Sequence, residues 1–332
     1  MREVADRAQV AMSSVSRVLS EHPDVSSAMR ERVLAAVEEL GYRPDLLAQG
    51  LRRGATHSVG FLVGDISNPL LAEMVKGAEQ RLRQEGYSLL LSNSERNVER
   101  EAESVHLFSQ RRVDGLILSL ATETEPATLM AIAELEAPFV LLDREIVGDH
   151  GASLVLTDHR AGMRAAVGHL LDLGHREIAL IVGVEMRPTR ERVAGAREAY
   201  AERGIEDTLS VAVGTFASEH GERASEQLLA RSTPPTAIVA TGNQILIGLL
   251  RTFQRRDLRF PDDISLLTCD ETEITAILQP QIGAISRDNL EAGRVAAGLL
   301  LRRMAGADQP ETVLLETRFA ARSSCAPPRA LR

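Results

Sequence analysis

A short segment near the N-terminus carries hydroxyl groups and a guanidinium opposite an apolar stripe. The stripe consists of Val15, Val18 and Leu19. The opposite face carries four polar side chains, namely Ser13, Ser14, Ser16 and Arg17. Serine hydroxyls donate hydrogen bonds to phosphate oxygens, and an arginine can donate two hydrogen bonds to one guanine. The segment therefore has the chemistry to contact nucleic acid, although a solvated helix arginine is the simpler alternative for Arg17.

The residues before this segment predict a second helix that would position it. Residues 4–8 form a short helical pattern in which Ala5 and Ala8 are small enough for another helix to cross close above them. Val10 and Val15 can fill the angle between the two helices. These are the steric requirements of a helix-turn-helix, whose second helix enters the major groove of DNA. A generic three-helix unit with no nucleic-acid role is the alternative.

A third helix and a hinge are predicted next. The third helix covers about residues 27–40, with Ser26 as its N-cap and Gly41 as its C-terminal stop. Residues 45–53 have helical propensity but are interrupted by Gly50. Because so short a helix is marginal alone in water, we expect a hinge that becomes ordered only when it packs on something.

The composition is that of a globular protein without a membrane span or a basic surface. The 332 residues are 44% hydrophobic and 26% charged, and no apolar run approaches the ~18 residues of a spanning helix. Cys269 and Cys325 form neither a metal spacing nor a disulfide framework, and no secretory signal is visible at Met1. We therefore expect a cytoplasmic, nucleoid-associated protein. The net charge is −9, and residues 1–57 hold eight arginines and eight acids, which predicts weak non-specific affinity for DNA.

From Ser58 onward the pattern changes to alternating apolar runs and amphipathic helices. About ten strand candidates lie between Val59 and Leu315, with helical patterns between most of them. Such alternation is typical of parallel sheets covered by helices on both faces. The predicted fold class is α/β, with a small all-α head followed by a bilobal core of two Rossmann-like parallel-sheet subdomains.

The chain resembles the lac-repressor family of bacterial transcription regulators over essentially its whole length. The head carries Val-Ala-x-x-Ala-x-Val followed by Val-Ser-Arg-Val-Leu, at residues 4–10 and 15–19. Further markers are Val-Gly-Asp-Ile-Ser-Asn-Pro, Val-Asp-Gly-Leu-Ile, Leu-Asp-Arg, Gly-His-Arg-Glu-Ile, Arg-Val-Ala-Gly and Cys-Asp-Glu-Thr-Glu, beginning at residues 63, 113, 142, 174, 192 and 269. The resemblance implies a homodimeric repressor that binds a pseudo-palindromic operator DNA, with a core similar to periplasmic sugar-binding proteins.

The resemblance also implies a division of the chain. We expect a DNA-binding head over residues 1–44, a hinge helix and linker over residues 45–57, and an effector-binding and dimerisation core over residues 58–332. Lobe 1 of the core should contain about residues 58–158 and 287–312. Lobe 2 should contain about residues 159–286 and 313–326.

Seven residues are candidates for DNA contact by this resemblance. Met12, Ser13 and Arg17 match positions that face base edges, where a methionine can touch a thymine methyl group. Two serines match positions near phosphates, namely Ser14 and Ser16. Leu51 matches a hinge leucine that wedges into the minor groove, and Ala48 packs against its twin in the dimer. The alternatives are that Met12 packs on the head and that Leu51 docks on the core.

Three positions depart from the family pattern in the head. Met1 stands where an apolar residue follows a helix-capping threonine, so the cap is missing. Gln9 replaces the turn glycine and should adopt a positive φ at a cost of roughly 1 kcal/mol. Ala11 replaces the serine that caps the recognition helix, a loss of roughly 0.5–2 kcal/mol.

An effector site between the lobes is the second implication, since ligands of such folds bind at the carboxyl ends of the strands. The residues carried over are Asp65, Asn68, Asp143, Arg144, Arg192, Phe216, Asn243 and Asp270. Carboxylates accept from hydroxyls, arginines donate, and one aromatic ring offers an apolar face, so we expect a carbohydrate or carbohydrate derivative. The alternative is that the aspartates cap loops or helices and that Arg192 is an arginine on the surface of a helix. An ungapped match instead places Gly242 at the ligand-contacting position, so Gly242 is the alternative to Asn243.

Two other classes of protein, an enzyme and a solute-binding receptor, fit the sequence less well. No Gly-rich phosphate loop, Gly-x-Ser-x-Gly elbow or paired-histidine metal motif is present, so no catalytic residue, cofactor or metal is predicted. A solute-binding receptor without operator binding would explain the core but not the head.

Overall fold

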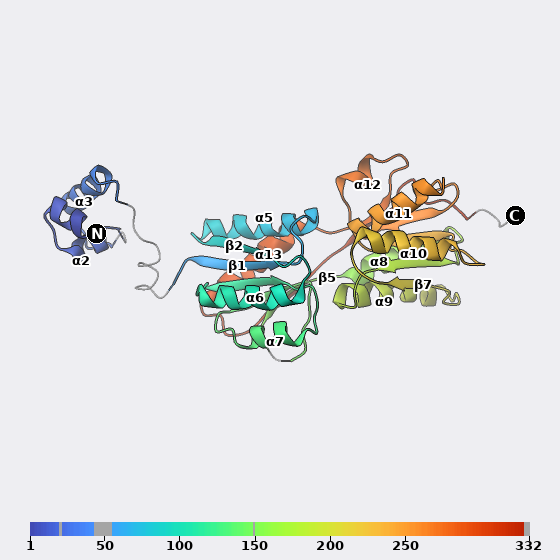
Figure 1. Cartoon of the computed structure of the whole chain (residues 1–332), viewed down its shortest axis with the longest axis horizontal. Coiled ribbons are helices and arrows are strands. Elements are labelled where there is room, and N and C mark those ends of the chain that lie inside the picture. Colours follow the sequence, from blue (N-terminus) through green and yellow to red (C-terminus); the bar gives the residue numbers. More distant parts are fainter. Residues whose placement is uncertain (20–21, 43–54, 149, 329–332) are drawn as a thin grey trace. The chain divides into compact units, whose positions relative to one another are not determined.

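The computed structural model describes residues 1–19, 22–42, 55–148 and 150–328. They belong to two compact units, Met1–Thr56 and His57–Arg332, and each is described by itself (Figure 1). The predicted hinge helix, with its DNA-contact candidates Ala48 and Leu51, lies outside the described residues. None of the described helices is long and apolar enough to span a bilayer.

The described residues of the first unit form three helices around a small apolar centre. They are α1 (Arg2–Ala8), α2 (Met12–Leu19) and α3 (Ser27–Glu39). Their centre is made mainly of valines and alanines, including Val4, Ala8, Val15 and Val33. Helix α1 ends at Ala8 and is capped by Gln9, whose φ of +51° confirms the predicted left-handed turn. Helix α3 begins after its N-cap: the Ser26 hydroxyl accepts from the amide of Met29, as predicted.

Lobe 1 of the second unit is a parallel sheet with the strand order β11-β5-β4-β3-β1-β2. Its strands are β1 (Ser58–Val63), β2 (Ser88–Asn93), β3 (Gly115–Ser119), β4 (Phe139–Leu142), β5 (Ser153–Thr157) and β11 (Thr312–Leu315). One face is covered by α5 (Pro69–Gln84) and α13 (Asn289–Met304), and the other by α6 (Val98–Gln110) and α7 (Pro126–Ala133) (Figure 1). Strands buried on both faces explain the continuous apolar runs in the sequence.

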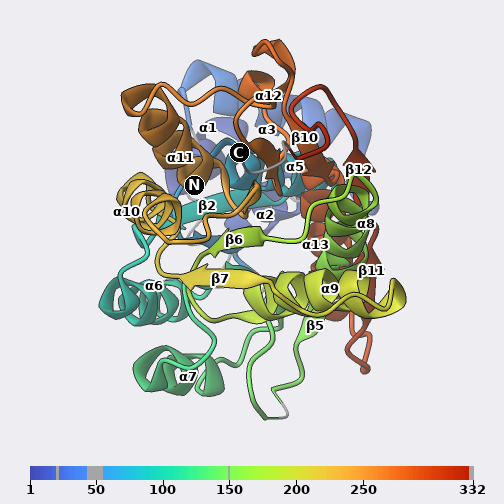
Figure 2. The same ribbon diagram turned by 90° about the vertical axis from the view of Figure 1, so that its right-hand side faces the viewer.

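Lobe 2 repeats this arrangement with the strand order β12-β10-β9-β8-β6-β7. Its strands are β6 (Ile178–Val182), β7 (Ser210–Val213), β8 (Ala237–Ala240), β9 (Ser265–Thr268), β10 (Gly283–Ser286) and β12 (Arg318–Ala320), of which β12 alone in this sheet runs antiparallel to its neighbour. Helices α8 (His159–Asp172) and α9 (Arg187–Glu202) cover one face, and α10 (Ser218–Leu229) and α11 (Asn243–Arg255) cover the other (Figure 2). A short helix, α12 (Glu273–Ile277), follows β9.

The chain crosses between the lobes after β5, after β10 and after β11. The last crossing corrects one predicted boundary. The prediction that residues 313–315 belong to lobe 2 is wrong, because they lie in β11, which pairs with β5 in the sheet of lobe 1. The sequence also predicted neither β5 nor β12, nor the short helices α7 and α12.

Helices α5 and α13 approach so closely that glycines are required where they cross. A Cβ atom at Gly77 would lie 2.0 Å from the carbonyl oxygen of Leu290, and one at Gly293 would lie 1.9 Å from that of Met74. Both neighbours are backbone atoms, which cannot turn aside as a flexible side chain would. By contrast, Gly298 on α13 faces only the tip of Arg302, at 4.0 Å.

We therefore expect Gly77→Ala to destabilise the core by about 1–3 kcal/mol, because the added methyl group forces α5 and α13 apart. The matched control, Gly298→Ala, should stabilise it by up to about 1 kcal/mol through helix propensity alone. Chemical denaturation of the two variants beside the parent measures both values. Equal effects of the two substitutions would contradict the close crossing.

Candidate functional site

Helix α2 presents a polar face to solvent and an apolar face to the centre of the head. Val15 and Val18 are buried. On the other side Ser13 and Arg17 are exposed, and Met12 is 54% exposed, so it does not pack into the head. The two remaining candidates, Ser14 and Ser16, are half-buried. This is the arrangement that a recognition helix needs, and contact of these residues with DNA remains a prediction.

A cavity lies between the two lobes of the core, where the carboxyl ends of the two sheets meet. Seven of the eight predicted effector residues line it: Asn68, Asp143, Arg144, Arg192, Phe216, Asn243 and Asp270. They come from the loops and the first two helical turns after β1, β4, β6, β7, β8 and β9. Gly242 lines the cavity beside Asn243, so both candidates for that position are present.

Asp65 does not line this cavity. Its carboxylate accepts from the amide of Ser67 at 3.0 Å and from the hydroxyl of the same residue at 2.6 Å. These bonds close the loop between β1 and α5, which is the loop-capping role that stood as the alternative for the aspartates.

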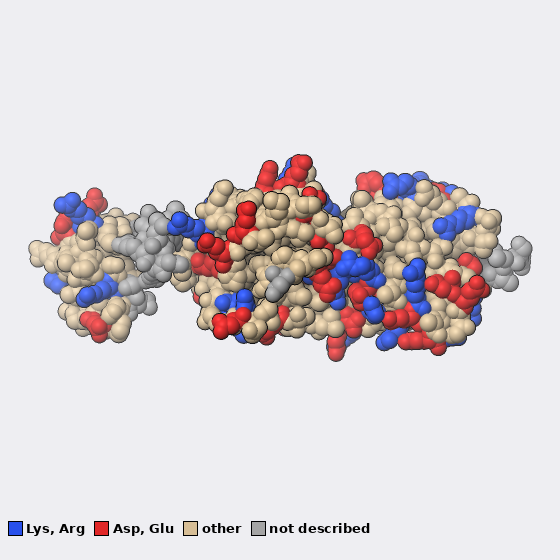
Figure 3. Space-filling model, turned by 90° about the horizontal axis from the view of Figure 1, so that it is seen from below, with Lys and Arg blue, Asp and Glu red and all other residues tan. Residues whose placement is uncertain are grey.

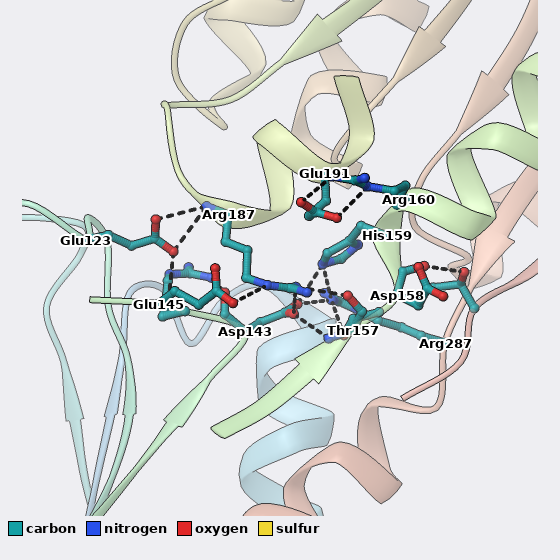
Figure 4. Close-up of polar contacts among 12 residues, drawn as sticks. Glu123, Asp143, Glu145, Thr157, Asp158, His159, Arg160, Arg187, Glu191 and Arg287 are labelled. Atoms are coloured by element: carbon teal, nitrogen blue, oxygen red, sulfur yellow. Dashed lines mark hydrogen bonds and ion pairs between the residues drawn. The ribbon is translucent and has the colours of Figure 1, made fainter. Parts of the chain in front are cut away.

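Asp143 is buried, and both of its carboxylate oxygens accept from protein donors (Figure 4). Oδ1 accepts from the amide of Thr157 at 2.9 Å, and Oδ2 accepts from Nε2 of His159 at 2.9 Å and from the guanidinium of Arg287. Burial alone would raise the pKa of Asp143, but His159 and Arg287 outweigh it and hold this pKa well below its usual range. Asp143 therefore joins β4, the start of α8 and the crossing after β10, rather than offering open oxygens to a ligand.

The histidine of this cluster is neutral. Burial lowers the pKa of His159 to about 3, although Asp143 acts in the opposite direction. Donation to a carboxylate requires a proton on Nε2 of the neutral ring. The negative charge of Asp143 is therefore balanced chiefly by Arg287, with Arg187 3.9 Å away.

A second buried carboxylate fastens lobe 1 to helix α9 of lobe 2. Glu123 is 4% exposed, and its oxygens accept from the amide of Arg187 at 3.1 and 3.0 Å (Figure 4). Glu123 also accepts from the amide of Glu145 and forms an ion pair with Arg190 at 3.0 Å. A carboxylate at the first turn of a helix satisfies free amides and interacts favourably with the helix dipole.

Two contacts also join the lobes beside the cavity. The side-chain amide of Asn243 donates to Oδ1 of Asn68 at 3.0 Å. The guanidinium of Arg96 lies over the ring of Phe216, 5.2 Å from its centroid. Within lobe 2, Arg192 donates to the carbonyl of Thr241 at 2.8 Å.

Asp270 accepts from the amide of Asn243 at 3.2 Å, at the first turn of α11. It thus combines a capping role with a position in the cavity wall.

Sequence reasoning missed several residues that line the cavity, above all Arg96 and Arg287. Arg96 follows β2 and has a φ of +60°, while Arg287 follows β10 directly. The available signal is the position of a charged residue just after a strand, but neither residue lies in one of the family motifs.

Glu101 on α6 is fully buried beneath this wall. Its Oε1 accepts from the amide of Ala121, which lines the cavity, and its Oε2 has no hydrogen-bond partner among the described residues. Burial raises the pKa of Glu101 to about 7. In the unfolded chain this carboxyl ionises near 4.5, the ordinary pKa of a glutamate side chain. The folded core must therefore lose stability as the pH rises from about 4.5 to 7.

We expect Glu101→Gln to remove this loss, since the amide keeps an oxygen for Ala121 and carries no charge. The variant should be more stable than the parent by roughly 3 kcal/mol at pH 8 and similar to it at pH 4. Thermal or urea unfolding as a function of pH measures the difference. The exposed neighbour Glu103, changed to glutamine, is the control. A difference between Glu101→Gln and the parent that does not vary with pH would refute the assignment.

Comparisons with known proteins bear on both units. Residues 1–45 match the family described as bacterial regulatory proteins, lacI family. Residues 167–325 match the periplasmic binding protein-like domain.

Relatives match almost the whole chain. Catabolite control protein A of Priestia megaterium is 32% identical over 305 residues, 91% of both chains. The ribose operon repressor of Escherichia coli K12 is 32% identical over 308 residues, 92% of both chains. Among solved structures, the lac repressor dimer bound to operator and the anti-inducer ONPF superposes with a TM-score of 0.85 at 27% identity, covering 97% of this chain and 98% of that one.

Proposed function

This chain belongs to the lacI family of bacterial regulatory proteins, and we infer that it is a transcriptional repressor controlled by a small effector. As a member of this family it regulates transcription and is not an enzyme. The observation that carries the proposal is the combination, in one chain, of an exposed polar face on α2 with a cavity walled by hydrogen-bonding side chains in the core.

In this proposal the protein is a cytoplasmic homodimer with one head on each half of a pseudo-palindromic operator. A two-fold protein requires a two-fold site, and each half-site is read by the exposed side chains of α2. Met12, Ser13 and Arg17 contact base edges, and Ser14 and Ser16 contact phosphates. Ala48 and Leu51 belong to this proposed interface by resemblance alone.

The effector in this proposal is a carbohydrate or a derivative of one. The cavity wall offers Arg192 and Asn243 as donors, Asp270 as an acceptor and Phe216 as an apolar ring. This set of groups suits a ligand with several hydroxyls, because each hydroxyl can both donate and accept. Asp65 plays no part, and Asp143 contributes by holding the wall in place.

The primary test is retardation of a specific duplex by the purified full chain, with the operator obtained by sequencing the DNA bound across the genome. A regulator should retard that duplex far more strongly than a scrambled one. A solute-binding receptor would bind ligand but retard neither duplex, and this outcome would overturn the proposal.

Arg17→Ala should weaken operator binding by about 1–3 kcal/mol and relax the preference at one base pair per half-site, because a bidentate contact to guanine is lost. The control is Arg32→Ala, which removes the same charge from an exposed position on α3. Binding to operator and to random duplex is measured for both variants. Equal weakening on the two duplexes by Arg17→Ala would show a phosphate contact instead of a base contact.

Arg192→Ala and Asp270→Ala should abolish the response to effector while the effector-free chain still binds operator. A ligand that favours one state by ~3 kcal/mol changes operator affinity about a hundredfold, so the loss is easily measured. Operator affinity with and without members of a carbohydrate panel gives the readout. Arg197→Ala is the control on α9, because Arg197 is exposed and pairs with Asp207. A normal response in both cavity variants would show that the regulatory site lies elsewhere.

A further inference from the structure

The charges that line the cavity between the lobes do not balance. Four arginines and two aspartates belong to its wall, namely Arg96, Arg144, Arg192, Arg287, Asp143 and Asp270. Arg287 is paired with Asp143. Three arginines therefore remain opposite one carboxylate, that of Asp270, which gives the wall a formal excess of two positive charges.

The three remaining arginines form no ion pair with a carboxylate of the described residues. Arg144 donates to the carbonyls of Leu120 and Asp143, and Arg192 donates to a third carbonyl. Arg96 makes no side-chain hydrogen bond to the described chain and only stacks on Phe216. Arg192 is buried, and Arg96 and Arg144 are half-buried. Withdrawing a guanidinium from water is costly unless an anion compensates its charge.

The surroundings of Arg96 and Arg144 show the same imbalance. Burial lowers the pKa of both guanidinium groups, and this effect exceeds that of the acids nearby. For Arg96 the opposing acid is Asp65, whose carboxylate is already engaged by Ser67. An anionic ligand would supply the charge that the protein itself does not place within ion-pair distance.

We propose that the effector is a polyhydroxylated molecule with one anionic group, a phosphate or a carboxylate, and that Arg96 binds this group. The proposal rests on the proposed regulatory function. The planar fork of an arginine matches a phosphate or carboxylate with two parallel hydrogen bonds. Arg96 is suited to this because its nitrogens make no hydrogen bond to the described residues. It also lies at a junction of the two lobes, over Phe216 of lobe 2. The class comprises sugar phosphates and sugar acids.

The rest of the cavity wall can bind the hydroxyl groups of such a ligand. Asp270 can accept from a hydroxyl, and the uncommitted nitrogens of Arg192 can donate to one. A neutral sugar would satisfy the same two groups but would leave the positive excess of the wall uncompensated. Binding of an anionic ligand should therefore depend on Arg96, whereas binding of a neutral sugar should not.

The first experiment uses inorganic phosphate as the probe on the full chain, with chloride of equal ionic strength as the reference. Phosphate should raise the unfolding temperature in a saturable manner, and Arg96→Gln should weaken its apparent affinity by about tenfold, equivalent to ~1.4 kcal/mol. Arg100→Gln is the matched control, since Arg100 is exposed, pairs with Glu95 and lies four residues away. Absence of a phosphate effect, or an equal effect in the Arg96 variant, would overturn the proposal.

The second experiment separates the sources of the anion and tests release of operator. Pools of neutral monosaccharides, of sugar phosphates and of sugar acids are added in turn to the protein–operator complex. One of the two anionic pools should change the operator affinity of the parent and of Arg100→Gln. The same pool should change the operator affinity of Arg96→Gln far less. A neutral pool that acts equally on all three proteins would overturn the anionic assignment. Failure to bind any operator would sink the regulatory function instead, and the phosphate titration would still decide the anion site.

Discussion

One buried carboxylate, that of Asp143, holds the core together where its lobes join. Its oxygens receive hydrogen bonds from Thr157 and His159, which belong to the crossing after β5, and from Arg287, which belongs to the crossing after β10. Since an unpaired buried carboxylate is costly, these segments must converge for Asp143 to remain ionised. Glu123 of lobe 1 is a second buried carboxylate of this kind, and it accepts hydrogen bonds from the amide of Arg187 at the start of α9. The lobes are thus joined by charge-assisted hydrogen bonds, whereas each lobe packs its own apolar clusters on the two faces of its sheet.

This division gives the core a way to change shape without loss of packing. A lobe whose apolar clusters are complete can rotate about the crossings while they stay intact, as in hinge closure. The contacts beside the cavity, Asn68 with Asn243 and Arg96 with Phe216, each use groups that a ligand could engage instead. Exchange of such contacts for ligand contacts is what gives a ligand unequal affinity for two arrangements of the lobes.

The sequence was sufficient for the class of fold because long amphipathic periods and buried apolar runs are local signals. It was insufficient for short elements such as β12, whose strand pairing depends on a partner more than thirty residues away. The same limit applies to the aspartates that follow strands. Asp65, Asp143 and Asp270 look equivalent in sequence, yet one closes its own loop, one is buried among cations and one caps α11 in the cavity wall. What distinguishes Asp143 is Arg287, 144 residues further along the chain, and no local pattern contains that partner.

The distribution of charge limits how such a regulator can bind DNA. Residues 1–57 are neutral in sum, so the remainder of the chain carries the whole net charge of −9. Figure 3 shows acidic and basic side chains lying next to one another over both lobes. One such group pairs Arg160 with Glu191 and Glu198. An acidic core is repelled by phosphates and a neutral head releases few counterions, so little affinity comes from random DNA. In the proposed function, operator affinity therefore depends on directed contacts to bases and phosphates. The ratio of specific to non-specific binding, rather than affinity alone, then decides which sites in a genome are occupied.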